Sequence, residues 1–389
     1  MITSFELHKL RMPVGRAIGD NSCSYERFDV AALALRTSDG LTGWGYGTAM
    51  SDGYFERTGW WIRIMPAEAA MRAEFESATM PALRSLNCDE DWLSKGIELD
   101  AGFGAVTMAL RQALWDLAAK QAKLPLWRWL AKKYSGISPP DGAAPQVPAY
   151  GSLLDFGVPE EAVAALLHRY LEMGMGAIKV KIGAGDARRD LRRLRLISDA
   201  VGPTVQLFAD ANEVWDSQTC ISRLRYFHHY GIRLRYIEDP LPRDDLAGFL
   251  ALRGHIPCEV GGHDYFERYE QWEDFILKGA LDVVRSGQNT AIQCRVARLC
   301  AEKRLPIFYG NSIGELNVHA AAALPGTERI EYSHVGWTAL FATPVQVVNG
   351  FMIPPAGDGF GLDPKPEALR EFHHPVPSER ISRPCPWVS

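Results

Sequence analysis

The sequence lacks three features that would each indicate a particular class of protein. None of its seven cysteines forms a Cys-x-x-Cys pair, so it has neither the usual zinc-site spacing nor a disulfide framework. Its apolar runs are far shorter than the roughly 20 residues of a membrane-spanning helix. The first residues, MITSFELHKL, have no apolar core after a basic start. We therefore expect free thiols, no membrane partner and a cytoplasmic location.

A strong excess of charge is also missing. The 42 Lys and Arg against 47 Asp and Glu leave a formal net charge of −5, which gives no basic surface for nucleic acid. The segment GAGD at 183–186 lacks the further glycine and the Gly-Lys-Ser/Thr of a phosphate loop, so a nucleotide site has little support. What remains is a chain of 389 residues, 47% hydrophobic, that can bury large cores in one to three domains.

The first part of the chain changes pattern once. Up to about residue 60 it reads as strands, and DVAALALRTSDGLTGWGYG predicts a hairpin around a Ser-Asp-Gly turn. From about residue 66 the pattern is helical, and VTMALRQALWDLAAKQ repeats apolar residues at helical spacing. Strands followed by helices predict a separate α+β domain over residues 1–135.

A Pro/Gly-rich joint at 135–146 precedes a second pattern, in which short apolar strands alternate with helix-like segments. Eight such strands recur at intervals of roughly 22–30 residues. They lie near residues 147, 177, 204, 233, 256, 280, 305 and 328. This count and spacing predict an α/β fold, a TIM barrel of the (β/α)8 or modified (β/α)7β type, over residues 136–340.

Ionisable residues stand at the ends of several of these strands, where such barrels carry their chemistry. In MGAIKVKIGAG, Lys179 and Lys181 share one face of the second strand. Asp210 ends the third strand, Glu238 the fourth, and Glu331 lies on the eighth. Each has a structural explanation, as a helix cap, a loop carboxylate or an ion-pair partner. Converging carboxylates nevertheless favour a bound cation, and hard oxygen ligands suit Mg²⁺.

With these residues in place, nearly the whole chain resembles the enolase superfamily, in its mandelate racemase-like and acid-sugar dehydratase branch. DGLTGWGYG and ALRQALWDLAAKQAKLPLWRWL resemble its N-terminal capping domain. IKVKIG, DAN, IEDPLPRDDL and the segment ending in TERIEY resemble its barrel. The segment from 341 to 389 resembles the family's return to the capping domain, so we expect that domain to be discontinuous.

The resemblance assigns roles to individual residues. Lys181 is implied to be the base that takes the proton beside a substrate carboxylate, and Lys179 its partner. Mg²⁺ would stabilise the enediolate that forms. The remaining implied roles are metal ligation by Asp210 and Glu238, substrate contact by Asn212, and hydrogen-bond donation to the enediolate by a protonated Glu331.

Three positions depart from the family's pattern. Gly262 stands where the third metal-ligating glutamate belongs, so Glu259 or Asp264 would have to substitute for it. The His-Asp acid/base pair is missing, because Gly287 and Gly310 occupy its two positions. With a base on one face of the carbon only, racemisation is disfavoured, and a β-elimination that uses Lys181 remains possible.

Arg285 faces the interior that these glycines vacate. It could pair with Glu238 or Glu259 as a structural residue, or bind the substrate anion bidentately. Candidates for the missing acid are Tyr309, His319 and His334. For His319 packing on a helix is the favoured interpretation, and the pleat decides whether Tyr309 or its neighbour Phe308 faces inward.

Together these observations predict a Mg²⁺-dependent lyase that dehydrates a sugar acid or similar hydroxy-carboxylate. The alternatives are an atypical member that binds a carboxylate without the usual metal chemistry, and a racemase or epimerase. We expect the loops at 15–28 and 47–61 to cover the site, and the family's habit of assembly implies a homo-oligomer. The sequence names neither the substrate nor the general acid.

Overall fold

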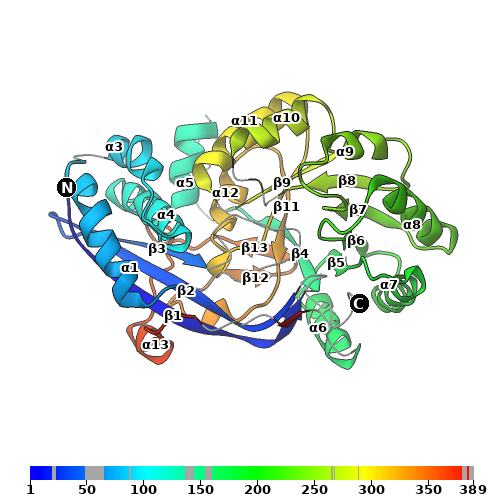
Figure 1. Ribbon diagram of the computed structural model, residues 1–389, viewed down its shortest axis with the longest axis horizontal. Coiled ribbons are helices and arrows are strands. Elements are labelled where there is room, and N and C mark those ends of the chain that lie inside the picture. The colour runs from blue at the N-terminus through cyan, green and yellow to red at the C-terminus, as the bar shows by residue number, and fades with distance from the viewer. Residues whose placement is uncertain are drawn as a thin grey trace.

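The computed structural model describes residues 1–19, 23–48, 65–86, 89–135, 144–153, 160–263, 266, 268–287, 289–378 and 383–384. An antiparallel sheet with helices on one side lies beside a closed barrel of parallel strands (Figure 1). Among the described residues, no helix combines the length and the apolar character that crossing a membrane requires.

The strands fall into these two parts. The antiparallel sheet contains β1 (Ile2–Gly19), β2 (Cys23–Thr37), β3 (Thr42–Thr48) and β14 (Arg383–Pro384). The barrel contains β4 (Val147–Leu153), β5 (Ala177–Lys181), β6 (Gln206–Asp210), β7 (Leu234–Glu238), β8 (Glu259–Gly262), β9 (Val283–Ser286), β10 (Ile307–Tyr309) and β11 (Thr327–Tyr332), and β12 (Gln346–Val348) and β13 (Phe351–Ile353) are attached to it.

The helices before the barrel are α1 (Glu68–Glu74), η2 (Phe75–Thr79), α2 (Met80–Arg84), α3 (Asp89–Ser94), η3 (Gly96–Glu98), α4 (Gly104–Gln121), α5 (Leu126–Leu130) and η4 (Ala131–Ser135). Those from the barrel onward are α6 (Glu160–Glu172), α7 (Ala187–Val201), α8 (Ser217–His229), α9 (Leu246–Leu252), α10 (Tyr269–Leu277), α11 (Thr290–Lys303), η5 (Ile313–Glu315), α12 (Val318–Ala323), η6 (Trp337–Ala339) and α13 (Pro366–Glu371).

Helix α4 packs directly on β3, and glycine makes this close approach possible. A Cβ built on Gly45 would lie 1.9 Å from the backbone oxygen of Ala109, so a side chain at this position cannot fit. At the end of the same helix, the buried carboxylate of Asp116 accepts hydrogen bonds from the backbone N–H groups of Trp44 and Phe360. Through Asp116, helix α4 is therefore hydrogen-bonded both to β3 and to the C-terminal segment.

The barrel is closed, because β11 pairs with β4 in parallel as the other neighbours do. This confirms the predicted α/β barrel and its eight strands to within a few residues of their expected positions. Alternate residues point inward. An aromatic and aliphatic layer fills the middle of the barrel and consists of Tyr150, Ala177, Phe208, Tyr236, Val283 and Phe308. Phe308 thus faces inward, and Tyr309 faces the outer core.

The C-terminal segment contacts both parts of the molecule. Strand β13 pairs antiparallel with the barrel strand β4. Further on, the backbone N–H of Arg11 donates to the carbonyl of Phe372, and β14 pairs with β2. The boundaries at 135 and 340 remain predictions.

Candidate active site

Lys179 lies where the inner faces of four barrel strands meet. Its Nζ is 2.5 Å from Glu238 Oε1, 3.1 Å from Glu331 Oε1 and 3.4 Å from Asp210 Oδ2. All four side chains are at most 3% exposed. Three of them come from the adjacent strands β5, β6 and β7, which are in register because Lys181 pairs with Asp210 and Asp210 with Glu238. Glu331 comes from β11, which β4 separates from β5. The convergence predicted from the strand ends is therefore observed.

Lys181 lies two residues further along β5, on the same face as Lys179 and at the carboxyl end of the strand. Its Nζ is 2.6 Å from Asp210 Oδ2 and donates to Asn212 Oδ1 at 3.0 Å. Asn212 is buried and has a φ of 47°, in the left-handed region that asparagine tolerates. Its Nδ2 finds no acceptor among the described residues. This leaves one amide donor available beside the predicted base.

Arg285 on β9 adds a third cation. Its Nε lies 3.2 Å from Glu238 Oε2, and its Nη2 lies 2.7 Å from Glu331 Oε2. Its Nη1 donates to the Tyr150 hydroxyl at 2.5 Å. Of the alternatives that the sequence left open for Arg285, the structure shows the ion pair with Glu238. Sequence reasoning missed Tyr150, which pairs in register with Glu331 and belongs to the layer inside the barrel.

These contacts bring three carboxyl groups and three basic side chains together, so that each buried charge has a partner of opposite sign. Burial nevertheless raises the pKa of Glu238, against the attraction of Arg285 and Lys179. Burial disfavours the ammonium form of Lys179, but attraction to Glu238 and Glu331 outweighs it and raises the pKa of Lys179. For Glu331, burial opposes ionisation, and Lys179 and Arg285 overcome it, so the pKa of Glu331 is lowered. In this arrangement Glu331 accepts from Lys179 and Arg285, and its role as a protonated donor to the enediolate stays a prediction.

A magnesium ion needs oxygen ligands that are not already engaged. Here Lys179 contacts both Asp210 and Glu238, the second oxygen of Asp210 accepts the Asn212 N–H, and the second oxygen of Glu238 lies 3.2 Å from the Tyr236 hydroxyl. Within the described ranges no group of three or more His, Cys, Asp or Glu is placed to hold a metal ion. The residues as arranged do not fit Mg²⁺.

Of the two substitutes considered for the third ligand, the structure describes only Glu259, and its position does not fit the role. Glu259 begins β8, opposite Tyr236, and pairs with Arg235 at 3.3 Å near the amino-terminal end of the strands. Glu259 therefore does not lie at the predicted metal site, and the expectation that it replaces the third ligand is wrong. Asp264 lies outside the described residues, as do residues 20–22 and most of 47–61 of the expected covering loops. A Cβ at Gly262 would meet Asp239, not Asp210 or Glu238.

Two of the candidate acids are held away from the barrel interior. Tyr309 faces the outer core. The ring of His319 is buried, with Nδ1 accepting from Trp127 N and Nε2 3.0 Å from the Phe360 carbonyl, which confirms packing as its role. His334 lies after β11, hydrogen-bonded to the Tyr332 hydroxyl. It remains near the carboxyl end of the strands.

A histidine–aspartate pair that sequence reasoning missed exists elsewhere. Nδ1 of His263 lies 2.8 Å from Asp239 Oδ1. The imidazole packs among Phe249, Phe266 and Phe275 on the outer side of the strands, with ring centroids 4.7–5.7 Å away. These three phenylalanines belong to the outer core, so the pair lies apart from the charged layer around Lys179.

Two family models match the chain. One, described as the mandelate racemase/muconate lactonizing enzyme N-terminal domain, matches residues 2–131, and the other, enolase C-terminal domain-like, matches residues 162–368. The chain belongs to the enolase superfamily. The N-terminal match covers the capping domain, and the C-terminal match covers most of the barrel.

Individual relatives are enzymes that act on sugar acids. The chain is 25% identical over 367 residues to 3,6-anhydro-alpha-L-galactonate cycloisomerase of Streptomyces coelicolor, covering 92% of this chain and 94% of that protein. It is also 25% identical over 370 residues to arabinonate dehydratase of Saccharolobus solfataricus, covering 88% of this chain and 90% of the relative.

Solved structures share the whole enolase-superfamily fold. A mandelate racemase candidate from Mesorhizobium loti aligns with a TM-score of 0.85 at 27% identity, over 99% of this chain and 98% of its own. A racemase from Streptomyces coelicolor A3(2) with bound magnesium aligns with a TM-score of 0.78 at 22% identity, over 96% of this chain and all of its own. Magnesium is thus present in a protein of this fold, with the likeness limited to the fold.

Proposed function

We propose that this enolase-superfamily chain is a lyase that removes the proton α to the carboxylate of a small hydroxy acid, with a sugar acid as substrate and Lys181 as base. The observation that carries the proposal is the position of Lys181, at the carboxyl end of β5 between Asp210 and Asn212. The dehydratase and cycloisomerase relatives support a sugar acid as the substrate class.

The chemistry needs a base, a holder for the substrate and stabilisation of the charge that develops. A lysine acts as a base only in its neutral amine form, so Lys181 must lose its proton before turnover. The unengaged Nδ2 of Asn212 can donate to an oxygen of the substrate. Lys179 and Arg285 carry two positive charges in the same layer. These charges would stabilise the negative charge of an enediolate.

Magnesium dependence is the part of the expectation that the described residues do not support. In the arrangement seen, Lys179 and Arg285 neutralise the carboxylates that would otherwise call for a metal. We assign the charge stabilisation to these two side chains.

Proton exchange tests the function directly. Arabinonate, galactarate and related acid sugars would be incubated with the protein in D₂O, with NMR following α-deuteration and a carbonyl reagent following 2-keto acid formation. We expect at least one acid to exchange, and the exchange to slow by at least about 10²–10⁴-fold in Lys181→Met. Binding of an acid without exchange in the wild type would support the alternative, a carboxylate-binding member without catalysis.

A further inference from the structure

Glu315 carries a buried carboxyl group that the proposed function has not yet used. It ends η5, which follows β10, and is 6% exposed. Its φ of 61° lies in the left-handed region, which a glutamate rarely adopts. Its Oε2 has no hydrogen-bond partner among the described residues. A buried carboxyl left in this state is costly unless it serves a ligand.

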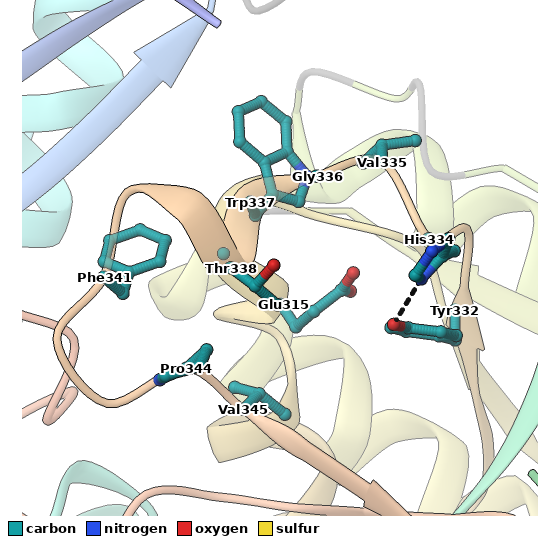
Figure 2. Close-up of a pocket in the computed structure, with 11 residues that line it drawn as sticks. Glu315, Tyr332, His334, Val335, Gly336, Trp337, Thr338, Phe341, Pro344 and Val345 are labelled. Atoms are coloured by element: carbon teal, nitrogen blue, oxygen red, sulfur yellow. Dashed lines mark hydrogen bonds between the residues drawn. The ribbon is translucent and has the colours of Figure 1, made fainter. Parts of the chain in front are cut away.

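The carboxyl group points into a small hollow. Figure 2 shows it directed between Tyr332 and His334 on one side and Trp337 and Thr338 on the other. The cavity measures about 20 Å³, room for about one water molecule. A hydroxyl group, or the water formed from it, would fit there.

This hollow belongs to the catalytic end of the barrel. Glu315 follows the carboxyl end of β10, and Tyr332 is the last residue of β11, as Lys181 and Asp210 are the last residues of β5 and β6. Glu331, the neighbour of Tyr332, is the carboxylate bound to both Lys179 and Arg285. Tyr332 and Glu331 point to opposite faces of β11, so the link between the hollow and the charged layer is electrostatic: the charge of Glu331 acts on Glu315 across the end of this strand.

Glu315 is held in its neutral form. Burial raises the pKa of Glu315 well above its usual range, and repulsion from the ionised Glu331 adds to the effect. The other titratable groups lining the hollow are Tyr332 and His334, which hydrogen-bond each other, and His334 also contacts Arg169. A neutral carboxyl group is a hydrogen-bond donor and an acid of the kind that the site otherwise lacks.

We propose that Glu315 is the general acid of the reaction and gives its proton to the leaving β-hydroxyl group of the substrate. The Lys181 amine first takes the α-proton, and the C–H electron pair passes into the carboxylate to give the enediolate. In the second step this electron pair returns to form the Cα=Cβ bond. The Cβ–O bond breaks with its electron pair on oxygen, which receives the Glu315 proton and leaves as water. The enol tautomerises to a 2-keto acid, and Lys181 and Glu315 exchange their protons with solvent. This inference rests on the proposed function.

A spectroscopic experiment tests the proton without any substrate. The infrared difference spectrum between wild type and Glu315→Gln at pH 7 should contain the carbonyl stretch of a protonated carboxyl group. Glu367→Gln, at an exposed position in α13, is the matched control and should show only ionised carboxylate bands. If the protonated band is missing from the Glu315 difference spectrum, Glu315 is ionised and the inference is overturned.

A kinetic experiment tests the transfer, with arabinonate or galactarate as the probe. Glu315→Gln should slow 2-keto acid formation by about 10²–10⁴-fold while α-deuteration in D₂O continues. An analogue with a β-fluoro leaving group, which needs less protonation, should restore most of the elimination rate. Normal 2-keto acid formation in Glu315→Gln would overturn the inference. Absence of α-deuteration in the wild type would instead count against the proposed function, and the infrared result would still decide the state of Glu315.

Discussion

Nη2 of Arg285 lies 2.7 Å from Oε2 of Glu331, and both side chains are almost wholly buried. The same guanidinium reaches Glu238 at 3.2 Å. Arg285 therefore bridges two carboxylates from strands on either side of it in the barrel, β7 and β11. Its removal would leave both of them without one of their two cationic partners.

We predict that Arg285→Met lowers the free energy of unfolding by about 3–5 kcal/mol, because it strips a partner from buried charges. Urea unfolding measures the loss. Arg253→Met is the matched control, since Arg253 makes a 2.8 Å ion pair with Asp282 at the surface and should cost at most about 1 kcal/mol. Adding Glu331→Gln to Arg285→Met should recover part of the stability, and equal losses in Arg253→Met and Arg285→Met would contradict the prediction.

The metal site gives a second prediction. Calorimetric titration of metal-stripped protein with Mg²⁺ should show no binding up to several millimolar, because Lys179 already contacts Asp210 and Glu238. Chelators should leave the thermal midpoint unchanged. Asp210→Asn and Glu259→Gln serve as comparison variants and should behave as the wild type does. Binding in the micromolar to low-millimolar range that disappears in Asp210→Asn would show that the lysine yields its place to the ion.

The sequence predicted the fold and half of the site for a physical reason. Strand periodicity fixes which residues share a face, and parallel strands in register bring their carboxyl ends to one edge. Lys179, Asp210 and Glu238 follow from these rules alone. The charge state of Glu331 does not, because it depends on Arg285 from a strand 46 residues away reaching across the barrel.

Glu315 was beyond sequence reasoning for another reason. It lies in a short irregular segment after β10, where no periodicity tells which way a side chain points. The segment contacts η6 and the capping-domain strand β3, and the residue pattern predicts neither these contacts nor the left-handed backbone. Loops of this kind are where a common barrel acquires individual chemistry.

Lys181 gives a third prediction. Lys181→Met should reduce α-proton exchange by at least about 10²–10⁴-fold, the usual contribution of a general base. Circular dichroism should show an unchanged fold. Lys179→Met should behave differently and lose stability as well, since Lys179 is the shared partner of Glu238, Glu331 and Asp210. If Lys181→Met still exchanged the α-proton at the wild-type rate, Lys181 would not be the base.

His319 gives a prediction on acid stability. Its ring nitrogens bind the Trp127 N–H and the Phe360 carbonyl, which joins α12 to α5 and to the C-terminal segment. Burial lowers the pKa of His319 to about 3, and the hydrogen bond to Phe360 opposes this only in part. In the unfolded chain this histidine is protonated below about pH 6.5. In the folded chain it stays neutral until the pH falls to about 3. The stability contributed by the neutral ring is therefore present above pH 6.5 and is lost as the pH falls.

Between pH 7 and pH 4.5 this histidine should cost the wild type about 2–3 kcal/mol of unfolding free energy. His319→Gln removes the titrating group, so its unfolding free energy, although lower at pH 7, should fall less steeply over the same range. His255→Gln, at an exposed position, should keep the wild-type slope. Urea unfolding at several pH values measures all three proteins. Identical slopes for the wild type and His319→Gln would mean that the ring between Trp127 and Phe360 accepts a proton without loss, against the burial seen here.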